Sequence, residues 1–239
     1  MAQSRSASGA PTTRSLSTDQ REFLSSYKNE HLKLGSGAFG TVALWTHINS
    51  GGRRAIKTQR LSDSSDVKEW EREEITLCEA ERSCDPDARY IVRLYVSCLT
   101  DAKHARDSKT VRFGYLVMEC CDRDLNWWLE KHPDRPLPDA LQLSTHLFCG
   151  LTFLHHHSII HRDLKPSNTL LTKTDDGWDL RIADFGLSRV KAPMMTAAVV
   201  TLPYRAPEIL LGAVTEQAGL QNSLQQSRGT HPHAHPAFG

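Results

Sequence analysis

The sequence of 239 residues lacks the features that mark several specialised classes of protein. Its 29 basic and 28 acidic residues leave a net charge of +1, so no broad field favours nucleic acid or a membrane surface. No apolar run approaches the length of a membrane span. The remaining composition, 39% hydrophobic and 24% charged, is typical of a globular protein with one core or two lobes. We therefore expect neither nucleic acid nor a membrane as a partner.

The cysteines of the sequence do not have the spacing of a disulfide framework. The six cysteines stand at positions 78, 84, 98, 120, 121 and 149, with no CxxC pair among them. This spacing argues against a disulfide framework and against a structural zinc site. We interpret them as reduced thiols and expect a cytoplasmic or nuclear location, or both.

Both ends of the chain lack hydrophobic pattern. The first 18 residues contain no acidic residue, two arginines and no apolar face, which favours a disordered tail over a transit peptide. The Gln-, His- and Pro-rich stretch at residues 213–239 also predicts disorder. We place the two tails at residues 1–26 and 213–239.

The first half of the remaining chain predicts a small β-sheet with one helix. Strand patterns occur in "HLKL", "TVALW", "RRAIKTQRL", "YIVRLYVSCL" and "FGYLVMEC". The stretch "DSSDVKEWEREEITLCEA" has the composition of a helix, with Ser and Asp as N-cap candidates. At 100° per residue its buried stripe is predicted to hold Val67, Trp70, Ile75, Leu77 and Cys78.

The second half predicts more helix. "DLNWWLEKH" indicates a short helix ended by Pro133, and "LPDALQLSTHLFCGLTFLHHH" a long one with several leucines on one side (Leu143, Leu147, Leu151 and Leu154). "NTLLT" and "DLRIADF" indicate two short strands, joined across Asp176–Gly177 as a hairpin.

A glycine-rich loop follows the first strand and reads "GSGAFG" from Gly35 to Gly40. The β-rich residues after it argue against a dinucleotide site, which needs a helix there, and no Gly-Lys-Ser/Thr follows as in a Walker loop. A glycine hairpin between strands can fold over a triphosphate, because glycine lets backbone N–H groups approach the oxygens closely. Taken alone, the motif is equally consistent with a plain hairpin.

Lys57 lies on the next predicted strand and points the same way as Ala55. Ala55 is small enough to cover a flat base, and the Lys57 ammonium can face phosphate oxygens. Among the helix carboxylates, Glu74 falls near the centre of the predicted apolar stripe and Glu73 on its flank. A carboxylate in an apolar stripe needs a cationic partner, so we assign Glu74 to Lys57. The alternative is a solvated, charged helix face.

The segment "HRDLKPSN", residues 161–168, is decisive because other motifs follow it in order. "DFG" stands at residues 184–186 and "APE" at residues 206–208. Each motif alone could be accidental, but the ordered set is highly specific. From about residue 28 to about residue 212 the sequence resembles the eukaryotic protein kinases.

This resemblance implies roles for individual residues. The glycine loop would cover the ATP phosphates, and Lys57 would contact the α- and β-phosphates and pair with Glu74. Asp163 would orient the substrate hydroxyl and accept its proton, and Lys165 would compensate charge on the transferred group. Asn168 and Asp184 would hold Mg²⁺, and Thr201 would brace the catalytic loop. Lys165 resembles the serine/threonine pattern.

ATP contacts are implied at further positions. Met118 resembles the gatekeeper and residues 119–121 the hinge. The full implied ATP-binding set is Leu34, Gly35, Ser36, Gly37, Gly40, Val42, Ala55, Lys57, Met118, Glu119, Cys121, Asp124 and Leu170.

"CDRDL" and "VVTLPYRAPEILLG" resemble the cyclin-dependent and mitogen-activated kinase group. This suggests a preference for proline after the phosphoacceptor. Thr196 matches an activation-loop phosphosite, clamped by Arg162 and Arg189. In that group a third arginine of the clamp directly precedes the glutamate that pairs with the lysine. With Glu74 in that role, the preceding residue is Glu73, so we expect a weakened clamp.

The resemblance implies an α+β, two-lobe kinase fold. The β-rich N-lobe would span residues 27–118, and a partial, mainly helical C-lobe residues 119–212. We find no later C-lobe motif after Glu208 and expect a truncated lobe. The leading function is ATP- and Mg²⁺-dependent phosphorylation of a protein substrate, with an activating kinase or regulatory subunit as a further partner. The alternatives are a catalytically impaired nucleotide-binding or regulatory module and, less favoured by "APE" and Lys165, a small-molecule phosphotransferase.

Overall fold

The computed structural model describes residues 24–37, 40–103, 110–134 and 136–190. Thr196, Thr201, the "APE" segment and the predicted C-terminal tail lie outside these residues. The chain divides into two compact units. Among the described residues, the first unit consists of residues 24–70 and 93–120, and the second of residues 71–92 and 121–190.

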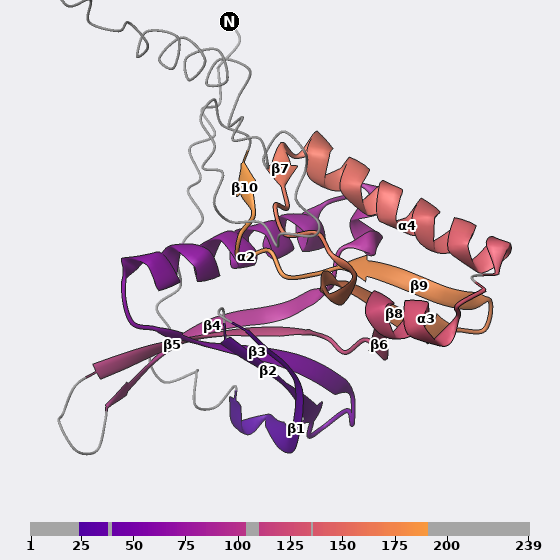
Figure 1. Cartoon of the computed structure of the whole chain (residues 1–239). Coiled ribbons are helices and arrows are strands. Elements are labelled where there is room, and N and C mark those ends of the chain that lie inside the picture. Colours follow the sequence, from indigo (N-terminus) through magenta and orange to yellow (C-terminus); the bar gives the residue numbers. More distant parts are fainter. Residues whose placement is uncertain (1–23, 38–39, 104–109, 135, 191–239) are drawn as a thin grey trace, which may run out of the picture. The chain divides into compact units, whose positions relative to one another are not determined.

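The first unit is built on a five-stranded antiparallel sheet (Figure 1) with strand order β1-β2-β3-β5-β4. The strands are β1 (Tyr27–Gly37), β2 (Gly40–His47), β3 (Arg53–Leu61), β4 (Leu94–Lys103) and β5 (Thr110–Glu119). The predicted sheet is therefore confirmed. The fourth strand starts four residues later than the pattern predicted, because Tyr90 ends a 3-10 helix, η1 (Pro86–Tyr90), and Ile91 and Val92 contact Ile182 instead.

The core of this unit lies along the central strands. Ile56 on β3 and Leu116 and Val117 on β5 are fully buried. Trp70 is 3% exposed, and its ring lies against Gly114, where a Cβ atom would overlap it. Glycine at this position thus lets the large indole pack directly on the sheet.

Helix α2 (Ser64–Arg82) begins as the sequence predicts but buries a different face. The Asp63 carboxylate accepts hydrogen bonds from the backbone N–H groups of Ser65 and Asp66, at 2.7 and 3.0 Å, and so caps the helix. The predicted buried stripe is partly wrong, because Ile75 is 52% exposed.

The buried positions of α2 are Trp70, Glu73, Thr76, Leu77 and Ala80. Their spacing of three, four and seven residues defines one helix face. Glu73 is 1% exposed and Leu77 fully buried, whereas Glu74 is only half-buried. The carboxylate that α2 buries is therefore Glu73, one residue before the predicted one.

Besides most of α2 and the 3-10 helix η1, the described part of the second unit contains two further helices and short sheets. The helices are α3 (Leu125–Lys131) and α4 (Leu137–His156), and a three-stranded sheet joins β6 (Arg123–Asp124), β8 (Thr169–Thr174) and β9 (Gly177–Ile182). β7 (Ile159–Ile160) pairs with β10 (Arg189–Val190), and a 3-10 turn, η2 (Pro166–Asn168), precedes β8. Both predicted helices and the β8–β9 hairpin are confirmed.

The core of the second unit lies between α4 and the β8–β9 hairpin. Phe153, Leu154, Leu171 and Ile182 are fully buried. Of the four leucines predicted to share one side of α4, Leu143 and Leu154 are buried, and Leu147 and Leu151 are half-buried.

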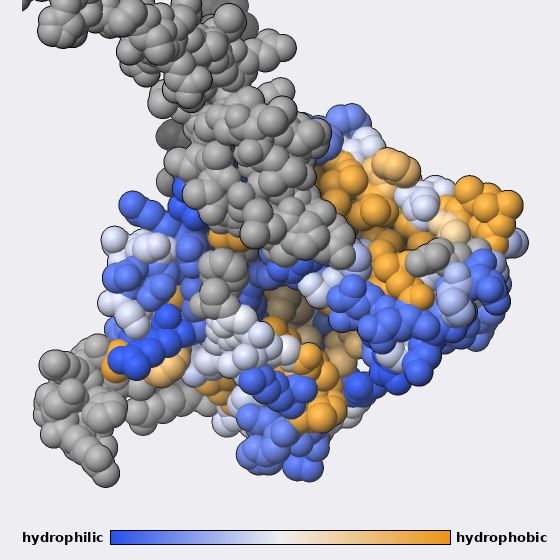
Figure 2. All heavy atoms as spheres, viewed as in Figure 1, coloured by the Kyte–Doolittle hydropathy of each residue, from blue (hydrophilic) through white to orange (hydrophobic). Residues whose placement is uncertain are grey.

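A second face of α4 carries exposed apolar side chains, seen as orange spheres along this helix in Figure 2. Leu137, Leu141 and Phe148 are 69%, 58% and 67% exposed. None of the helices in the described part of the chain is long and apolar enough to cross a membrane.

Candidate active site

The glycine loop is a hairpin between two strands, as the resemblance implies. Leu34, Gly35, Ser36 and Gly37 end β1, and Gly40 opens β2. Gly40 has a φ of +114°, and a Cβ there would overlap the backbone of Thr58. Only glycine fits this turn without strain. The strand after the loop agrees with the sequence argument against a dinucleotide site.

The neighbouring strands bring four predicted ATP-contacting residues into register within the first unit. Val42 pairs with Lys57 between β2 and β3, and Ala55 pairs with Met118 between β3 and β5. Lys57, Ala55 and Met118 are 7%, 8% and 7% exposed. The sheet thus groups them on adjacent strands, whereas their roles toward ATP stay predictions.

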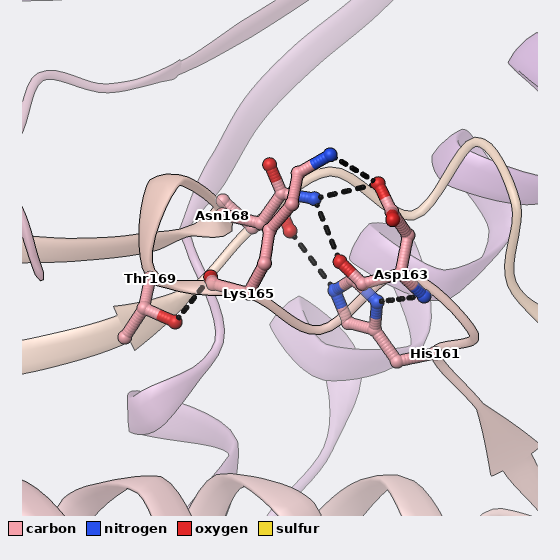
Figure 3. A network of polar contacts seen from close by, with 6 residues as sticks. His161, Asp163, Lys165, Asn168 and Thr169 are labelled. Atoms are coloured by element: carbon pink, nitrogen blue, oxygen red, sulfur yellow. Dashed lines mark hydrogen bonds and ion pairs between the residues drawn. The ribbon is translucent and has the colours of Figure 1, made fainter. Parts of the chain in front are cut away.

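The catalytic-loop residues of the second unit form one polar network (Figure 3). The Lys165 ammonium lies 2.7 Å from Asp163 Oδ2, and the Asn168 amide nitrogen donates to the same oxygen at 3.2 Å. Asn168 also donates to the Asp163 backbone oxygen at 2.9 Å. Asp163 is 5% and Asn168 7% exposed. A carboxylate buried beside a lysine and an amide is held in one orientation.

The Asn168 amide is oriented in a way that suits a cation ligand. Its nitrogen donates to two Asp163 oxygens, so its side-chain oxygen is the atom directed elsewhere. Amide and carboxylate oxygens are the ligands that Mg²⁺ takes in proteins. The Asn168 backbone oxygen accepts from the N–H of Ala183, which places Asn168 beside the residue that precedes Asp184. The predicted Mg²⁺ ligands, Asn168 and Asp184, thus lie on adjoining segments.

Backbone conformation is unusual at two of the motif residues. Arg162 and Asp184 both have φ of +67°, in the left-handed region that non-glycine residues rarely adopt. Such a conformation costs roughly 1–3 kcal/mol and persists only when the surroundings enforce it. The hydrogen bond from Ala183 N–H to the Asn168 oxygen, at 2.9 Å, is one such restraint beside Asp184.

His161 fixes the backbone beneath this network and does so as a neutral ring. Its Nε2 lies 3.0 Å from the Ala183 oxygen and must donate, while Nδ1 accepts from the Asp163 N–H at 3.3 Å. Protonation of Nδ1 would remove that acceptor. Burial lowers the pKa of His161, which keeps the ring neutral.

This burial predicts a pH dependence of stability. A histidine whose pKa is lowered by folding binds a proton more readily in the unfolded chain. Its contribution to the free energy of unfolding is therefore complete above the unfolded pKa and is lost as the pH falls below about 6.5. Burial also lowers the pKa of His146, which adds to the effect in the same window. We expect the free energy of unfolding to fall from pH 7 to pH 5 by at most about 1.4 kcal/mol per pH unit for His161, and by less for His146, which solvent screens. Urea unfolding across this range measures the slope, and His161→Gln should reduce it; an unchanged slope would contradict this account.

Two further arginines, Arg72 and Arg189, lie near Arg162. Its Nε donates to the Leu187 oxygen at 2.6 Å, and its Nη1 is buried without a hydrogen-bond partner among the described residues. Burial, and then the charges of Arg189 and Arg72, lower the pKa of Arg162. The expectation that α2 supplies no third arginine is therefore wrong, because Arg72 takes that place. A cluster of three cations with a buried unused donor is a site for an anion.

Several predicted residues make local contacts that the sequence does not reveal. The Asp124 carboxylate caps α3 by accepting from the Trp127 N–H at 2.8 Å, and Leu170 is the register partner of Asp124. Glu119 accepts from the Arg93 N–H at 2.8 Å. Cys121 is half-buried. Their proposed contacts with ATP stay predictions.

The structure also brings in residues that the sequence argument missed. The sequence pattern assigned the buried carboxylate of α2 to Glu74 rather than to Glu73, and Arg72, the residue before Glu73, was not considered. Thr169 was not considered at all, although its hydroxyl contacts the catalytic loop.

Comparison with known proteins agrees with this geometry. The family model described as "Protein kinase domain" matches residues 28–222. Cyclin-dependent kinase 4 of Xenopus laevis is 38% identical over 185 residues, covering 75% of this chain and 54% of that protein. Cell division control protein 2 homolog C of Antirrhinum majus is 36% identical over 195 residues, covering 76% of this chain and 59% of that protein.

The chain thus spans somewhat more than half the length of these relatives. The family match covers most of the chain, and the two relatives named are 38% and 36% identical to it over 185 and 195 residues. This chain therefore belongs to the eukaryotic protein kinase family, and within it the chain is similar in sequence to cyclin-dependent kinase 4.

Proposed function

We propose that this chain transfers the γ-phosphoryl group of Mg-ATP to a serine or threonine hydroxyl of a protein. The observation that supports this most is the Asp163 carboxylate, which is buried and held by Lys165 and Asn168. The substrate oxygen forms a bond to the γ-phosphorus while the bond from that phosphorus to the β–γ bridging oxygen breaks. The substrate proton passes to the Asp163 carboxylate, and ADP leaves.

The charged side chains of the catalytic loop fit this reaction. Phosphoryl transfer needs positioning and charge compensation more than covalent help. The Lys165 side chain is 25% exposed. It can therefore contact Asp163 and still be reached by the γ-phosphate of a bound nucleotide. When bound, Mg²⁺ neutralises phosphate charge, and Asn168 and Asp184 would hold it.

A direct test follows transfer of labelled γ-phosphate to peptides. We expect incorporation into serine or threonine, and a higher kcat/KM for a Ser-Pro peptide than for a matched Ser-Ala peptide. Equal values would refute the proline preference alone. Mg-ATP binding without transfer would instead favour a nucleotide-binding module. A cytoplasmic or nuclear location is part of the proposal, and fractionation of cells tests it.

The Glu73 carboxylate, which α2 buries, should contribute more to kcat/KM than the adjacent Glu74. We predict that Glu73→Gln lowers kcat/KM by about 10²-fold, because it removes the carboxylate that α2 buries and disturbs the helix that positions charged groups. Glu74→Gln, one residue away and half-buried, is the matched control and should stay within about threefold. Steady-state kinetics decides; a larger loss for Glu74→Gln would restore the original assignment.

The arginine cluster supports regulation by a phosphate, for which we propose Thr196. A phosphorylated threonine supplies about two negative charges and several acceptor oxygens to three guanidinium groups. We predict that phosphorylation of Thr196 raises kcat and that Arg72→Ala lowers this activation by about tenfold. Lys68→Ala, an exposed position on the same helix, is the control and should leave the activation unchanged. Full activation in Arg72→Ala would show that this arginine plays no part.

A further inference from the structure

Thr169 is a buried polar residue with a contact that the reaction described above does not use. It opens β8, lies 2% exposed and pairs in register with Ile182. A buried hydroxyl needs a hydrogen-bond partner. Thr169 Oγ1 donates to the backbone oxygen of Lys165 at 3.0 Å, as Figure 3 shows. The contact thus reaches back over the η2 turn into the catalytic loop.

The backbone oxygen of Lys165 accepts two hydrogen bonds in this loop. It accepts from the Asn168 N–H at 3.0 Å as well as from the Thr169 hydroxyl. A carbonyl oxygen has two lone pairs, so both bonds form at once. Because η2 contains only three residues and Pro166 has no N–H, few backbone hydrogen bonds hold it closed. Thr169 adds a side-chain restraint across the turn.

This restraint spans the two residues that hold the Asp163 carboxylate. Lys165 and Asn168 contact the same Asp163 oxygen at 2.7 and 3.2 Å. Their separation therefore sets the orientation of that carboxylate. A rotation of the Lys165 peptide plane would shift the Lys165 side chain relative to Asp163. Asn168 would stay in place, because its backbone oxygen accepts a hydrogen bond from the Ala183 N–H.

We propose that Thr169 is a positioning residue: its hydroxyl holds the Lys165 peptide so that Lys165 and Asn168 fix Asp163 for proton acceptance. The kinetic consequence rests on the proposed phosphoryl transfer, whereas the restraint on the turn does not. Thr169 acts through the loop and contacts neither substrate nor nucleotide in this role. A β-branched apolar residue would fill the same space but lack the bond.

The test compares Thr169→Val, Thr169→Ser and Thr172→Val in the full chain. Valine is nearly isosteric with threonine and removes only the hydroxyl. We expect Thr169→Val to lower kcat about fivefold with both KM values unchanged, as for loss of one hydrogen bond. Thr169→Ser keeps the hydroxyl and should restore kcat to within about twofold. Thr172→Val changes a half-buried threonine of the same strand and should resemble the wild type.

Hydrogen exchange read by mass spectrometry provides an arm independent of activity. The Asn168 amide should exchange several-fold faster in Thr169→Val than in the wild type or Thr169→Ser, with global stability little changed. An unchanged exchange rate of the Asn168 amide in Thr169→Val would overturn the proposal. So would an equal loss of protection in Thr169→Ser and Thr169→Val. If the wild type transfers no phosphate, the proposed function fails, and the exchange result still decides on Thr169.

Discussion

Asp163→Asn is expected to lower phosphoryl transfer by about 10²–10⁴-fold, the range for loss of a general base. The amide has the shape of the carboxylate and keeps one oxygen that can accept from Lys165 and Asn168. It cannot accept a proton from the substrate hydroxyl. The loss should therefore fall on kcat, with little change in the affinity for Mg-ATP. Single-turnover transfer of labelled phosphate measures the chemical step, and calorimetric titration measures nucleotide affinity.

The matched control for this variant is Asp179→Asn. Asp179 lies on β9 in the same unit, and its carboxylate contacts His146 and Arg181 rather than the catalytic loop. We expect its transfer rate to stay within about threefold of the wild type. More than a tenth of the wild-type rate in Asp163→Asn would show that Asp163 is not the base. A loss of nucleotide binding would show a wider disturbance of the site.

Phe153→Ala should be the most destabilising single change in the second unit. Phe153 is fully buried in α4 and packs against the His157 ring at a tilt of 36°, with ring centres 4.2 Å apart. Truncation of a buried phenylalanine costs about 3–5 kcal/mol, since burial is lost and a cavity remains. Domain stabilities are only about 5–15 kcal/mol, so much of the margin disappears. Urea unfolding monitored by circular dichroism measures the change.

The same helix offers the control. Phe148 lies five residues earlier on α4 and is 67% exposed, so Phe148→Ala removes the same side chain without opening a cavity. We expect its effect to stay within about 0.5 kcal/mol. Similar losses for both variants would mean that α4 buries the face carrying Phe148 in solution, contrary to the structure.

The grouping of the catalytic-loop residues could be predicted because they are close in sequence. Asp163, Lys165 and Asn168 lie within six positions, and a short loop leaves few ways to place them apart. The glycine hairpin and the Asp176–Gly177 turn were predictable for the same reason, since local backbone geometry decides them. Gly177 indeed has a φ of +132° at the start of β9.

The register of α2 could not be predicted from its own pattern. Glu73 and Glu74 are adjacent, and an apolar residue, Ile75, follows them. A helix wheel counts Ile75 toward the buried face, whereas the structure leaves it 52% exposed and buries Thr76 instead. Thr76 donates to the Arg72 oxygen and lies 3.3 Å from the Ser188 hydroxyl, so a polar contact from a distant segment selects this face. Contacts between distant segments are invisible to periodicity.

Arg72 was missed for the same reason. Once Glu73 is the buried carboxylate, the arginine before it comes beside Arg162 and Arg189, and the expected three-cation cluster is complete. One residue of helix register thus decides both the candidate catalytic carboxylate and the candidate phosphate site. The hydrogen bond of Thr169 depends on how β8 follows η2, which no sequence motif specifies.

Urea unfolding with and without Mg-ATP tests whether this chain holds Mg-ATP through its kinase motifs. A ligand at 100 times its dissociation constant stabilises the folded chain by about 2.7 kcal/mol. We predict such an upward shift for the wild type and a much smaller one for Asp184→Asn, which loses a proposed Mg²⁺ ligand. A wild-type transition that Mg-ATP does not move, or an equal shift in Asp184→Asn, would contradict the account.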